Sequence, residues 1–213
     1  MQAALIIVDM QNDFMPGGAL AIDDADKIIP IINNAMSFFS LVIAVQDSHP
    51  LGHISFVSSH PSAEVYSTIS VQGVEQRLWP EHCIKGTWGA LLHRNIHAEL
   101  IKHTVLKGED KEVDSYSAFF DNLHKRHTGL DAYLKKSEID TIYICGVATE
   151  YCVLYSVIDA LELGYSVFVI ADACKGIDLS ANDDNNALQI MRKLGADIIT
   201  SQELYNLAKE SLL

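Results

Sequence analysis

The chain alternates short, wholly apolar segments with segments of helical periodicity, and this alternation restricts its fold more than any other feature. Residues 3 to 8 and 41 to 45 are continuous apolar runs rich in Ile and Val, and polar residues follow each run at once. Strands that are buried on both faces of a sheet have this composition. Residues 25 to 39 lie between the runs and carry apolar side chains near the helical period. The first unit is therefore predicted to be β-α-β.

The same alternation continues through the rest of the chain. Four further strands are predicted at residues 104 to 106, 139 to 145, 166 to 171 and 197 to 200. Helices are predicted after residue 148, from about 182 to Gly195, and from about 202. The pattern indicates a three-layer α/β/α fold with a mainly parallel, six-stranded sheet. One domain over residues 1 to 213 accounts for the length.

Residues 48 to 103 interrupt this pattern. They are rich in His, Ser and Trp, show little periodicity, and form a connection much longer than those that usually join a strand to a helix. Long connections of this kind are usually functional. The excursion is therefore predicted to carry part of a binding site.

Charge and hydropathy exclude several classes of function. The formal net charge is −13 and no cluster of Lys and Arg occurs, which argues against nucleic acid or an anionic membrane as a partner. The apolar runs are far shorter than the roughly 18 to 20 residues of a membrane-spanning helix. The N-terminal segment has no basic region or small-residue cleavage site before its first strand, and the four cysteines lie far apart. We expect a cytoplasmic protein with free thiols and a small-molecule partner.

Polar residues that carry chemistry follow the predicted strands. Asp9, Asp47 and Lys107 each come at the end of a strand, and residues 146 to 152 form the turn after another. Taken singly, such residues are usually a turn carboxylate, a solvated lysine or a buried thiol. The carboxyl ends of parallel strands meet at one edge of the sheet, where ligands bind. This convergence favours a reaction site.

Cys152 is the candidate nucleophile at this edge. Thr149 is expected to cap the following helix, which places Cys152 in the first turn, where the helix dipole and a nearby ammonium from Lys107 would favour a thiolate by lowering the thiol pKa. Asp9 could hold the lysine and accept the thiol proton. The backbone N–H groups of Ala148 and Cys152 could stabilise an oxyanion. These roles together predict acyl transfer.

The segment QDSHPLGH contains a candidate metal site. Asp47 and His49 are two residues apart, so in an extended segment both side chains point the same way. A third ligand must come from elsewhere: His82, in the segment WPEHC, is the first candidate, and His53 and His60 compete with it. Two histidines and a carboxylate suit one divalent ion, with zinc preferred and iron or manganese as alternatives. With nine histidines in the chain, proximity by chance is the competing explanation.

Aromatic residues are expected near the same edge of the sheet. Phe14, Trp79, Trp88 and Tyr116 all lie on predicted loops. Each could be an ordinary core residue. Several aromatic side chains beside polar catalytic groups would instead indicate a flat, apolar substrate ring.

Five segments, taken together, resemble one known family. They are LIIVDMQNDFMPGGAL (5 to 20), QDSHPLGHISF (46 to 56), WPEHC (79 to 83), KGEDKEVDSYSAFFD (107 to 121) and CGVATEYCV (145 to 153). In this order they resemble the nicotinamidases and pyrazinamidases of the isochorismatase-like cysteine hydrolase superfamily. The resemblance runs from end to end of the chain. It implies hydrolysis of nicotinamide to nicotinate and ammonia, in the salvage of nicotinamide towards NAD.

The resemblance also implies roles for individual residues. It places Asp9, Lys107 and Cys152 in a catalytic triad, and it implies a cis bond between Val147 and Ala148 that directs the amides of Ala148 and Cys152 into an oxyanion hole. It places the metal on Asp47, His49 and His82, bound to the ring nitrogen of the substrate, with His53 as a further candidate ligand. Phe14, Trp79 and Tyr116 match residues that enclose the pyridine ring. Two positions depart from the common pattern: Glu150 replaces Asp, and Trp88 replaces Pro, which leaves the width of the pocket open.

Other functions remain open on the sequence alone. A superfamily amidase acting on another small amide would not need the metal for orientation. An iron(II) oxygenase would use the two histidines and the carboxylate as a facial triad. A metal- or pyridine-binding module would release no ammonia. The metal, the oligomeric state, including a homo-oligomer, and the preference between nicotinamide and pyrazinamide also remain open.

Overall fold

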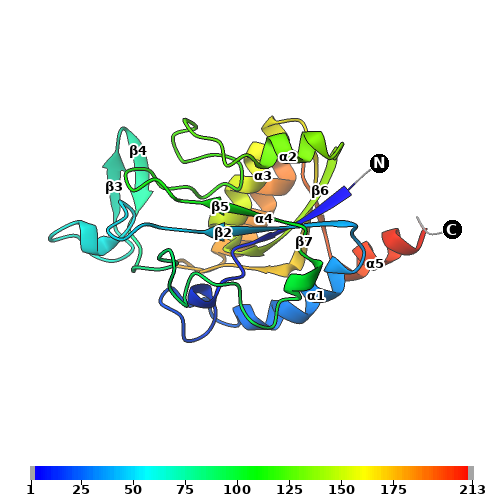
Figure 1. The fold of residues 1–213 in the computed structure, drawn as a ribbon, viewed down its shortest axis with the longest axis horizontal. Coiled ribbons are helices and arrows are strands. Elements are labelled where there is room, and N and C mark those ends of the chain that lie inside the picture. The colour runs from blue at the N-terminus through cyan, green and yellow to red at the C-terminus, as the bar shows by residue number, and fades with distance from the viewer. Residues whose placement is uncertain (1–2, 211–213) are drawn as a thin grey trace.

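The computed structural model describes residues 3–210, and its centre is a parallel sheet of six strands (Figure 1). The strand order is β5-β2-β1-β6-β7-β8, and every neighbouring pair is parallel. The strands are β1 (Ala3–Val8), β2 (Leu41–Asp47), β5 (His103–Lys107), β6 (Thr141–Val147), β7 (Ser166–Lys175) and β8 (Asp197–Ile199). The prediction of a mainly parallel, six-stranded sheet is confirmed. β1 and β2 are almost wholly buried, as their composition requires.

Helices cover the sheet on both sides. They are α1 (Ile29–Met36), α2 (Leu130–Lys136), α3 (Leu154–Glu162), α4 (Asp183–Leu194) and α5 (Ser201–Glu210). Figure 1 shows α1 and α5 on one side of the sheet and α2, α3 and α4 on the other. The three-layer prediction is therefore confirmed. α4 ends at Gly195, whose φ of 111° lies in the left-handed region that glycine adopts without strain.

The excursion between β2 and β5 contains a β-hairpin that the sequence reasoning missed. β3 (Thr68–Val71) and β4 (Val74–Arg77) pair in antiparallel fashion and project away from the main sheet (Figure 1). They are joined by Gln72 and Gly73, with φ angles of 51° and 88°. Two left-handed residues in a two-residue loop suit the twist of a hairpin. In the sequence, the Gln-Gly pair between Val71 and Val74 is the signal that could have predicted this hairpin.

Gly146 shows why the chain needs a glycine beside the reaction site. Its φ is 121°, and a Cβ atom there would overlap the backbone of Val8 on the neighbouring strand. The absence of a side chain lets β6 and β1 approach closely at their carboxyl ends. This approach brings the turn after β6 next to Asp9.

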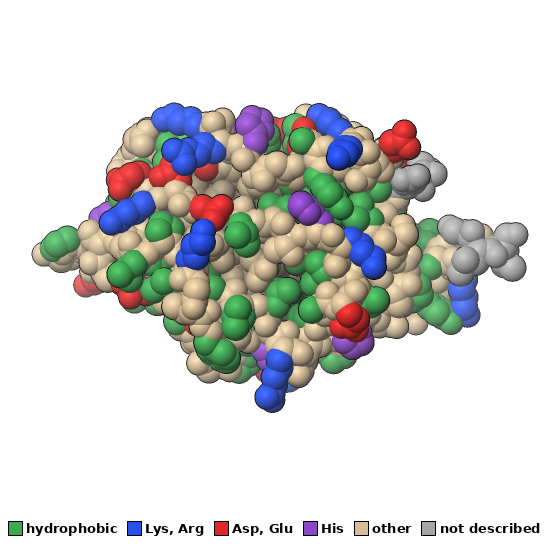
Figure 2. Space-filling view, in the orientation of Figure 1, with side chains coloured by type: hydrophobic (Ala, Val, Ile, Leu, Met, Phe, Trp, Pro, Cys, Tyr) green, Lys and Arg blue, Asp and Glu red, His purple; other side chains and the backbone are tan. Residues whose placement is uncertain are grey.

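The visible surface carries charges of both signs (Figure 2). On the face shown in Figure 2, Lys and Arg side chains are scattered among acidic and apolar ones. Within residues 3–210 no helix has the length and apolar character needed to cross a bilayer.

Candidate active site

The carboxyl ends of four adjacent strands bring the predicted reactive residues together. Lys107, at the end of β5, lies between two carboxylates: its Nζ is 3.0 Å from Oδ2 of Asp9 and 2.5 Å from Oδ1 of Asp47. The same Nζ is 3.3 Å from Sγ of Cys152 and donates to the carbonyl oxygen of Ser115 at 3.1 Å. All of these side chains are buried. The register explains the arrangement, since Asp47 pairs directly with Lys107 across β2 and β5.

Burial and ion pairing set the charges of this cluster. Burial would lower the pKa of Lys107, but Asp47 and Asp9 outweigh it and raise the pKa well above its ordinary value. Burial raises the pKa of Asp9 to about 7, because the attraction of Lys107 only partly offsets it. Burial would also raise the pKa of Asp47, yet Lys107 and the neighbouring histidines lower it. The lysine is thus a fixed cation, and Asp9 is a carboxylate with high proton affinity.

The expectation that the helix dipole and Lys107 give Cys152 a lowered thiol pKa was wrong. Burial raises the pKa of the thiol well above its ordinary value, and Asp9 adds to the effect, so the attraction of Lys107 does not compensate. A nearby cation and a helix dipole lower the pKa of a thiol, but the loss of solvent around Cys152 raises it by more. Asp9, which is hydrogen-bonded to the thiol, is the group placed to accept its proton during attack.

The turn that carries Cys152 also differs in detail from the prediction. Thr149 does not cap the helix: Ala148 occupies the cap position without a side-chain hydrogen bond, and residues Thr149–Val153 form a π-helical turn before α3. The N–H groups of Tyr151 and Val153 both donate to the carbonyl oxygen of Ala148. Cys152 nevertheless lies in the first turn, as expected. The peptide bond between Val147 and Ala148 is cis, as the family resemblance implied.

Asp47, His49 and His82 form a group that could hold a metal ion, with ligand atoms within 4.8 Å of one another. Nε2 of His49 and of His82 lie 3.5 and 3.8 Å from Oδ2 of Asp47. Nδ1 of His49 is 3.0 Å from the carbonyl oxygen of Gly108, and Nδ1 of His82 is 2.8 Å from that of Pro80. Since a carbonyl only accepts, each neutral imidazole has its proton on Nδ1 and its Nε2 lone pair directed at the carboxylate. Burial and His49 lower the pKa of His82 to about 4, which favours its neutral form, whereas Asp47 outweighs burial and raises the pKa of His49.

This donor set fits a divalent cation. Two imidazole lone pairs and a carboxylate oxygen repel one another unless a positive charge lies between them. Zinc is held by these ligand types, and ligating histidines usually donate their other N–H to a carbonyl or carboxylate, as here. The structure thus places the three predicted ligands together, and the other oxygen of the Asp47 carboxylate, Oδ1, accepts a hydrogen bond from Lys107 Nζ.

The two competing histidines lie differently. Nε2 of His60 donates to the carbonyl oxygen of Ile54, 2.6 Å away, and His60 is not part of any candidate metal group among residues 3–210. The ring of His53 lies beside that of His49, tilted by 31° with centroids 4.2 Å apart, and His53 shares a second candidate group with His49 and Asp114. His82 is therefore the histidine that completes the site predicted from Asp47 and His49.

An apolar cavity lies beside Cys152 and the metal-binding group. Phe14, Trp79 and Tyr116 line it, as predicted. The indole N–H of Trp79 lies 3.2 Å from the Tyr116 hydroxyl. Trp88, the fourth aromatic residue expected at this edge, is 64% exposed and does not line this cavity, so that expectation was wrong.

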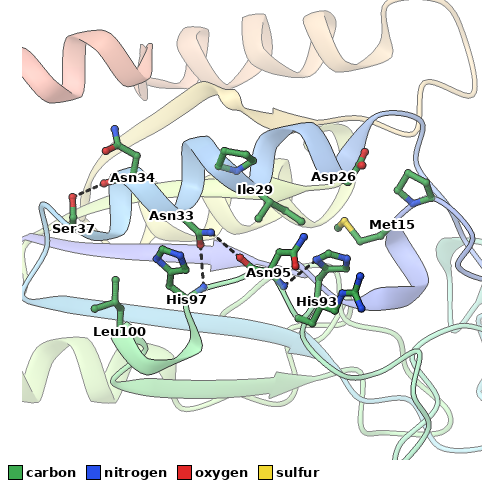
Figure 3. Close-up of a pocket in the computed structure, with 13 residues that line it drawn as sticks. Met15, Asp26, Ile29, Asn33, Asn34, Ser37, His93, Asn95, His97 and Leu100 are labelled. Carbon is green, nitrogen blue, oxygen red and sulfur yellow. Dashed lines mark hydrogen bonds between the residues drawn. The ribbon is translucent and has the colours of Figure 1, made fainter.

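A larger groove, about 800 Å³ in volume, lies between α1 and residues 93–100 (Figure 3). The Asn33 side chain joins its two walls: its amide donates to the carbonyl oxygen of Asn95 at 2.7 Å, and its oxygen accepts from the N–H of His97 at 3.0 Å. Most of the lining residues are exposed, and none is a predicted site residue. Size alone therefore does not mark the reaction site in this molecule.

Comparison with known proteins identifies the family. A model of the isochorismatase domain matches residues 3–203. The chain belongs to the isochorismatase family. A nicotinamidase from Escherichia coli (strain K12) is 43% identical over 201 residues, which cover 92% of this chain and 94% of that protein.

Solved structures of the isochorismatase family agree with the fold. An Acinetobacter baumanii nicotinamidase/pyrazinamidase is 44% identical, with a TM-score of 0.92 over 95% of this chain and 98% of that one. A pyrazinamidase from Pyrococcus horikoshii in complex with zinc is 35% identical, with a TM-score of 0.77 over 94% and 99% of the two chains. The resemblance found in the sequence is thus confirmed at the level of family and fold.

The structure adds residues that the sequence reasoning missed. Gln11 holds the end of β2: its side-chain N–H donates to the carbonyl oxygen of Asp47, and its side-chain oxygen accepts from the N–H of Asp47, both at 2.8 Å. Leu20, Tyr151 and Ile177 add to the walls of the cavity. Gln11 lies within a segment already singled out, but Ile177 comes from a region without any chemical motif. Only the fold brings it to the site.

Proposed function

We propose that the chain is a nicotinamidase that hydrolyses nicotinamide, and also pyrazinamide, to the carboxylic acid and ammonia. The observation that carries this proposal is the buried contact of Lys107 Nζ with Asp9, Asp47 and Cys152 next to a cavity walled by aromatic rings. Such a cluster supplies a nucleophile, a proton acceptor and a cation for amide chemistry. The curated E. coli relative bears the same activity in its name.

The reaction proceeds through a thioester on Cys152. Asp9 accepts the thiol proton as Sγ attacks the carboxamide carbon, and the N–H groups of Ala148 and Cys152 stabilise the tetrahedral oxyanion. Asp9 then gives the proton to the departing nitrogen, and ammonia leaves. A water molecule, deprotonated by the same carboxylate, attacks the thioester carbon and releases nicotinate and the thiol. Lys107 stabilises the negative charges of the cluster throughout.

Asp47, His49 and His82 would hold one divalent metal ion, and zinc is the ion we propose. When bound, the ion supplies an electrophilic centre for the ring nitrogen of the substrate. The zinc complex of the related Pyrococcus pyrazinamidase supports this choice. Phe14, Trp79 and Tyr116 would enclose the pyridine ring. We further propose a single domain acting in the cytoplasm, in the salvage of nicotinamide towards NAD.

An ammonia-release assay on nicotinamide, with and without a chelator, tests the function. We expect nicotinate and ammonia in equal amounts, a large loss of rate after chelation, and recovery when zinc is added back. Turnover of another small amide but not of nicotinamide, insensitive to chelation, would point to a different amidase of the family. Oxygen-dependent turnover would contradict the hydrolytic mechanism.

The metal ligands are tested by comparing His82→Ala with His60→Ala. His82→Ala should weaken zinc binding by more than about a hundredfold, because even the outer hydrogen-bond partners of metal ligands are worth about 10- to 100-fold in affinity. His60→Ala removes a histidine from the same excursion, outside the group, and should retain zinc. Metal content after dialysis, measured by mass spectrometry, distinguishes the two variants. Equal zinc content in both would exclude His82 as a ligand.

A further inference from the structure

The cavity beside Cys152 is too small for the proposed substrate. Its volume is about 20 Å³. A single water molecule needs roughly 10–15 Å³ on the same measure. A pyridine ring with a carboxamide group is several times larger than one water molecule. One wall of the cavity must therefore move when substrate enters and product leaves.

Two of the lining side chains form the outer wall. Of the residues that line the cavity, Tyr151 and Ile177 are half-buried, whereas the others are buried. Tyr151 lies on the same turn as Cys152, and its ring packs edge-on against Trp79, with centroids 4.8 Å apart. Ile177 lies in the connection between β7 and α4, and the residues that follow it, 178–182, are exposed. The connection is the wall with fewer packing constraints, so it is the one that can move.

Glu150 ties this connection to the turn that carries the nucleophile. Its Oε1 accepts hydrogen bonds from the backbone N–H groups of Ile177 and Asp178, both at 2.8 Å. Its Oε2 is buried and has no hydrogen-bond partner. A Cβ atom at Gly176 would lie only 2.6 Å from Oε2, so the glycine allows the carboxylate to approach the backbone closely. One side chain, two residues before Cys152, thus fixes the position of Ile177.

We propose that Glu150 is a positioning residue that latches residues 176–178 over the cavity, and that substrate passes between Tyr151 and Ile177 when the latch opens. The inference rests on the proposed function for the identity of the ligand. Loop opening of this kind commonly controls substrate entry and product release without taking part in the chemistry. Loss of the latch should expose Cys152 and weaken substrate binding more than it slows the chemical step.

The test compares Glu150→Ala with Glu150→Gln in the zinc-loaded protein. Glutamine has the same length and keeps a side-chain oxygen that can accept both N–H groups, whereas alanine has no acceptor. The probe is iodoacetamide, and peptide mapping by mass spectrometry separates alkylation of Cys152 from that of the other three cysteines. We expect Cys152 to be alkylated about tenfold faster in Glu150→Ala and within about twofold of the parent rate in Glu150→Gln.

Steady-state kinetics give a second readout. For nicotinamide, Glu150→Ala should raise KM by about tenfold while kcat changes by less than about threefold, and Glu150→Gln should restore both values. Ile177→Ala shortens the side chain that forms the outer wall and leaves Glu150 in place, so it should also speed alkylation of Cys152. This variant tests the inference if Glu150→Ala does not fold. Unchanged alkylation in a folded Glu150→Ala variant, or equal acceleration in the Ala and Gln variants of Glu150, would overturn the inference; if Glu150→Ala does not fold, unchanged alkylation in Ile177→Ala would overturn it.

These measurements separate the latch from the proposed function. Alkylation requires no turnover. If the protein releases no ammonia but shows the expected alkylation pattern, the latch is supported and the proposed substrate is contradicted. If the protein releases ammonia from nicotinamide but Glu150→Ala does not change the alkylation rate, the proposed function is supported and the latch is contradicted.

Discussion

Replacing Cys152 with alanine is expected to reduce the release of ammonia from nicotinamide by a factor on the order of 10⁴ or more, while the bound metal is retained. Sγ of Cys152 lies 3.3 Å from Lys107 Nζ and beside the cavity, so it is the atom that can form the covalent intermediate. The proposed metal ligands, Asp47, His49 and His82, are other side chains, so we expect the metal content to stay unchanged. Ammonia release and zinc content, measured on the same preparation, check both parts.

Cys174→Ala is the matched control for this variant. Cys174 is also a buried free thiol, but it lies in β7 and does not line the cavity. It should retain activity within a few fold, with at most a modest loss of stability from the small cavity created. Substantial turnover in Cys152→Ala would contradict a covalent mechanism.

Lys107→Met is expected to destabilise the protein strongly and to abolish activity. The ammonium contacts the carboxylates of Asp9 and Asp47, and all three side chains are buried. Removal of one partner from a buried ion pair typically costs about 3–5 kcal/mol, because the remaining charges lose their compensation. Urea unfolding, followed by circular dichroism, measures the loss in free energy of unfolding. The protein is metal-free in this experiment, so that no added cation compensates the charge of the carboxylates.

The double variant Lys107→Met with Asp9→Asn separates charge from packing. Neutralising Asp9 removes one of the two uncompensated carboxylates, so the double variant should regain part of the stability while remaining inactive. A double variant as unstable as Lys107→Met, or less stable, would show that the lysine stabilises the fold through its packing and not through its charge.

Much of the fold could be predicted because its signals are local. Apolar runs such as 3 to 8 and 41 to 45 identify buried strands without knowledge of their partners, and the parallel alternation places their carboxyl ends together. That rule predicts that the residues at these ends, Asp9, Asp47 and Lys107, lie together, as they do. The hairpin at Gln72 and Gly73 was missed because its strands are short and mostly exposed, so no apolar pattern marks them.

Other features depend on tertiary structure and could not be predicted from local patterns. The raised pKa of the Cys152 thiol follows from complete burial, which depends on every element packed around the site. Ile177 reaches the cavity only because β7 extends to Lys175 and ends beside the turn after β6. Trp88 lies in a conspicuous motif, but its loop directs the side chain to solvent. Sequence identifies reactive side chains better than it identifies the walls around them.

The two oxygens of Asp47 face different halves of the site: Oδ1 contacts Lys107, and Oδ2 faces His49 and His82. A change in charge on either side of this carboxylate alters the field on the other. The free energies of binding on the two sides are therefore thermodynamically linked, and such linkage is reciprocal. Zinc affinities measured before and after alkylation of Cys152 would give this coupling energy as a ratio of two dissociation constants.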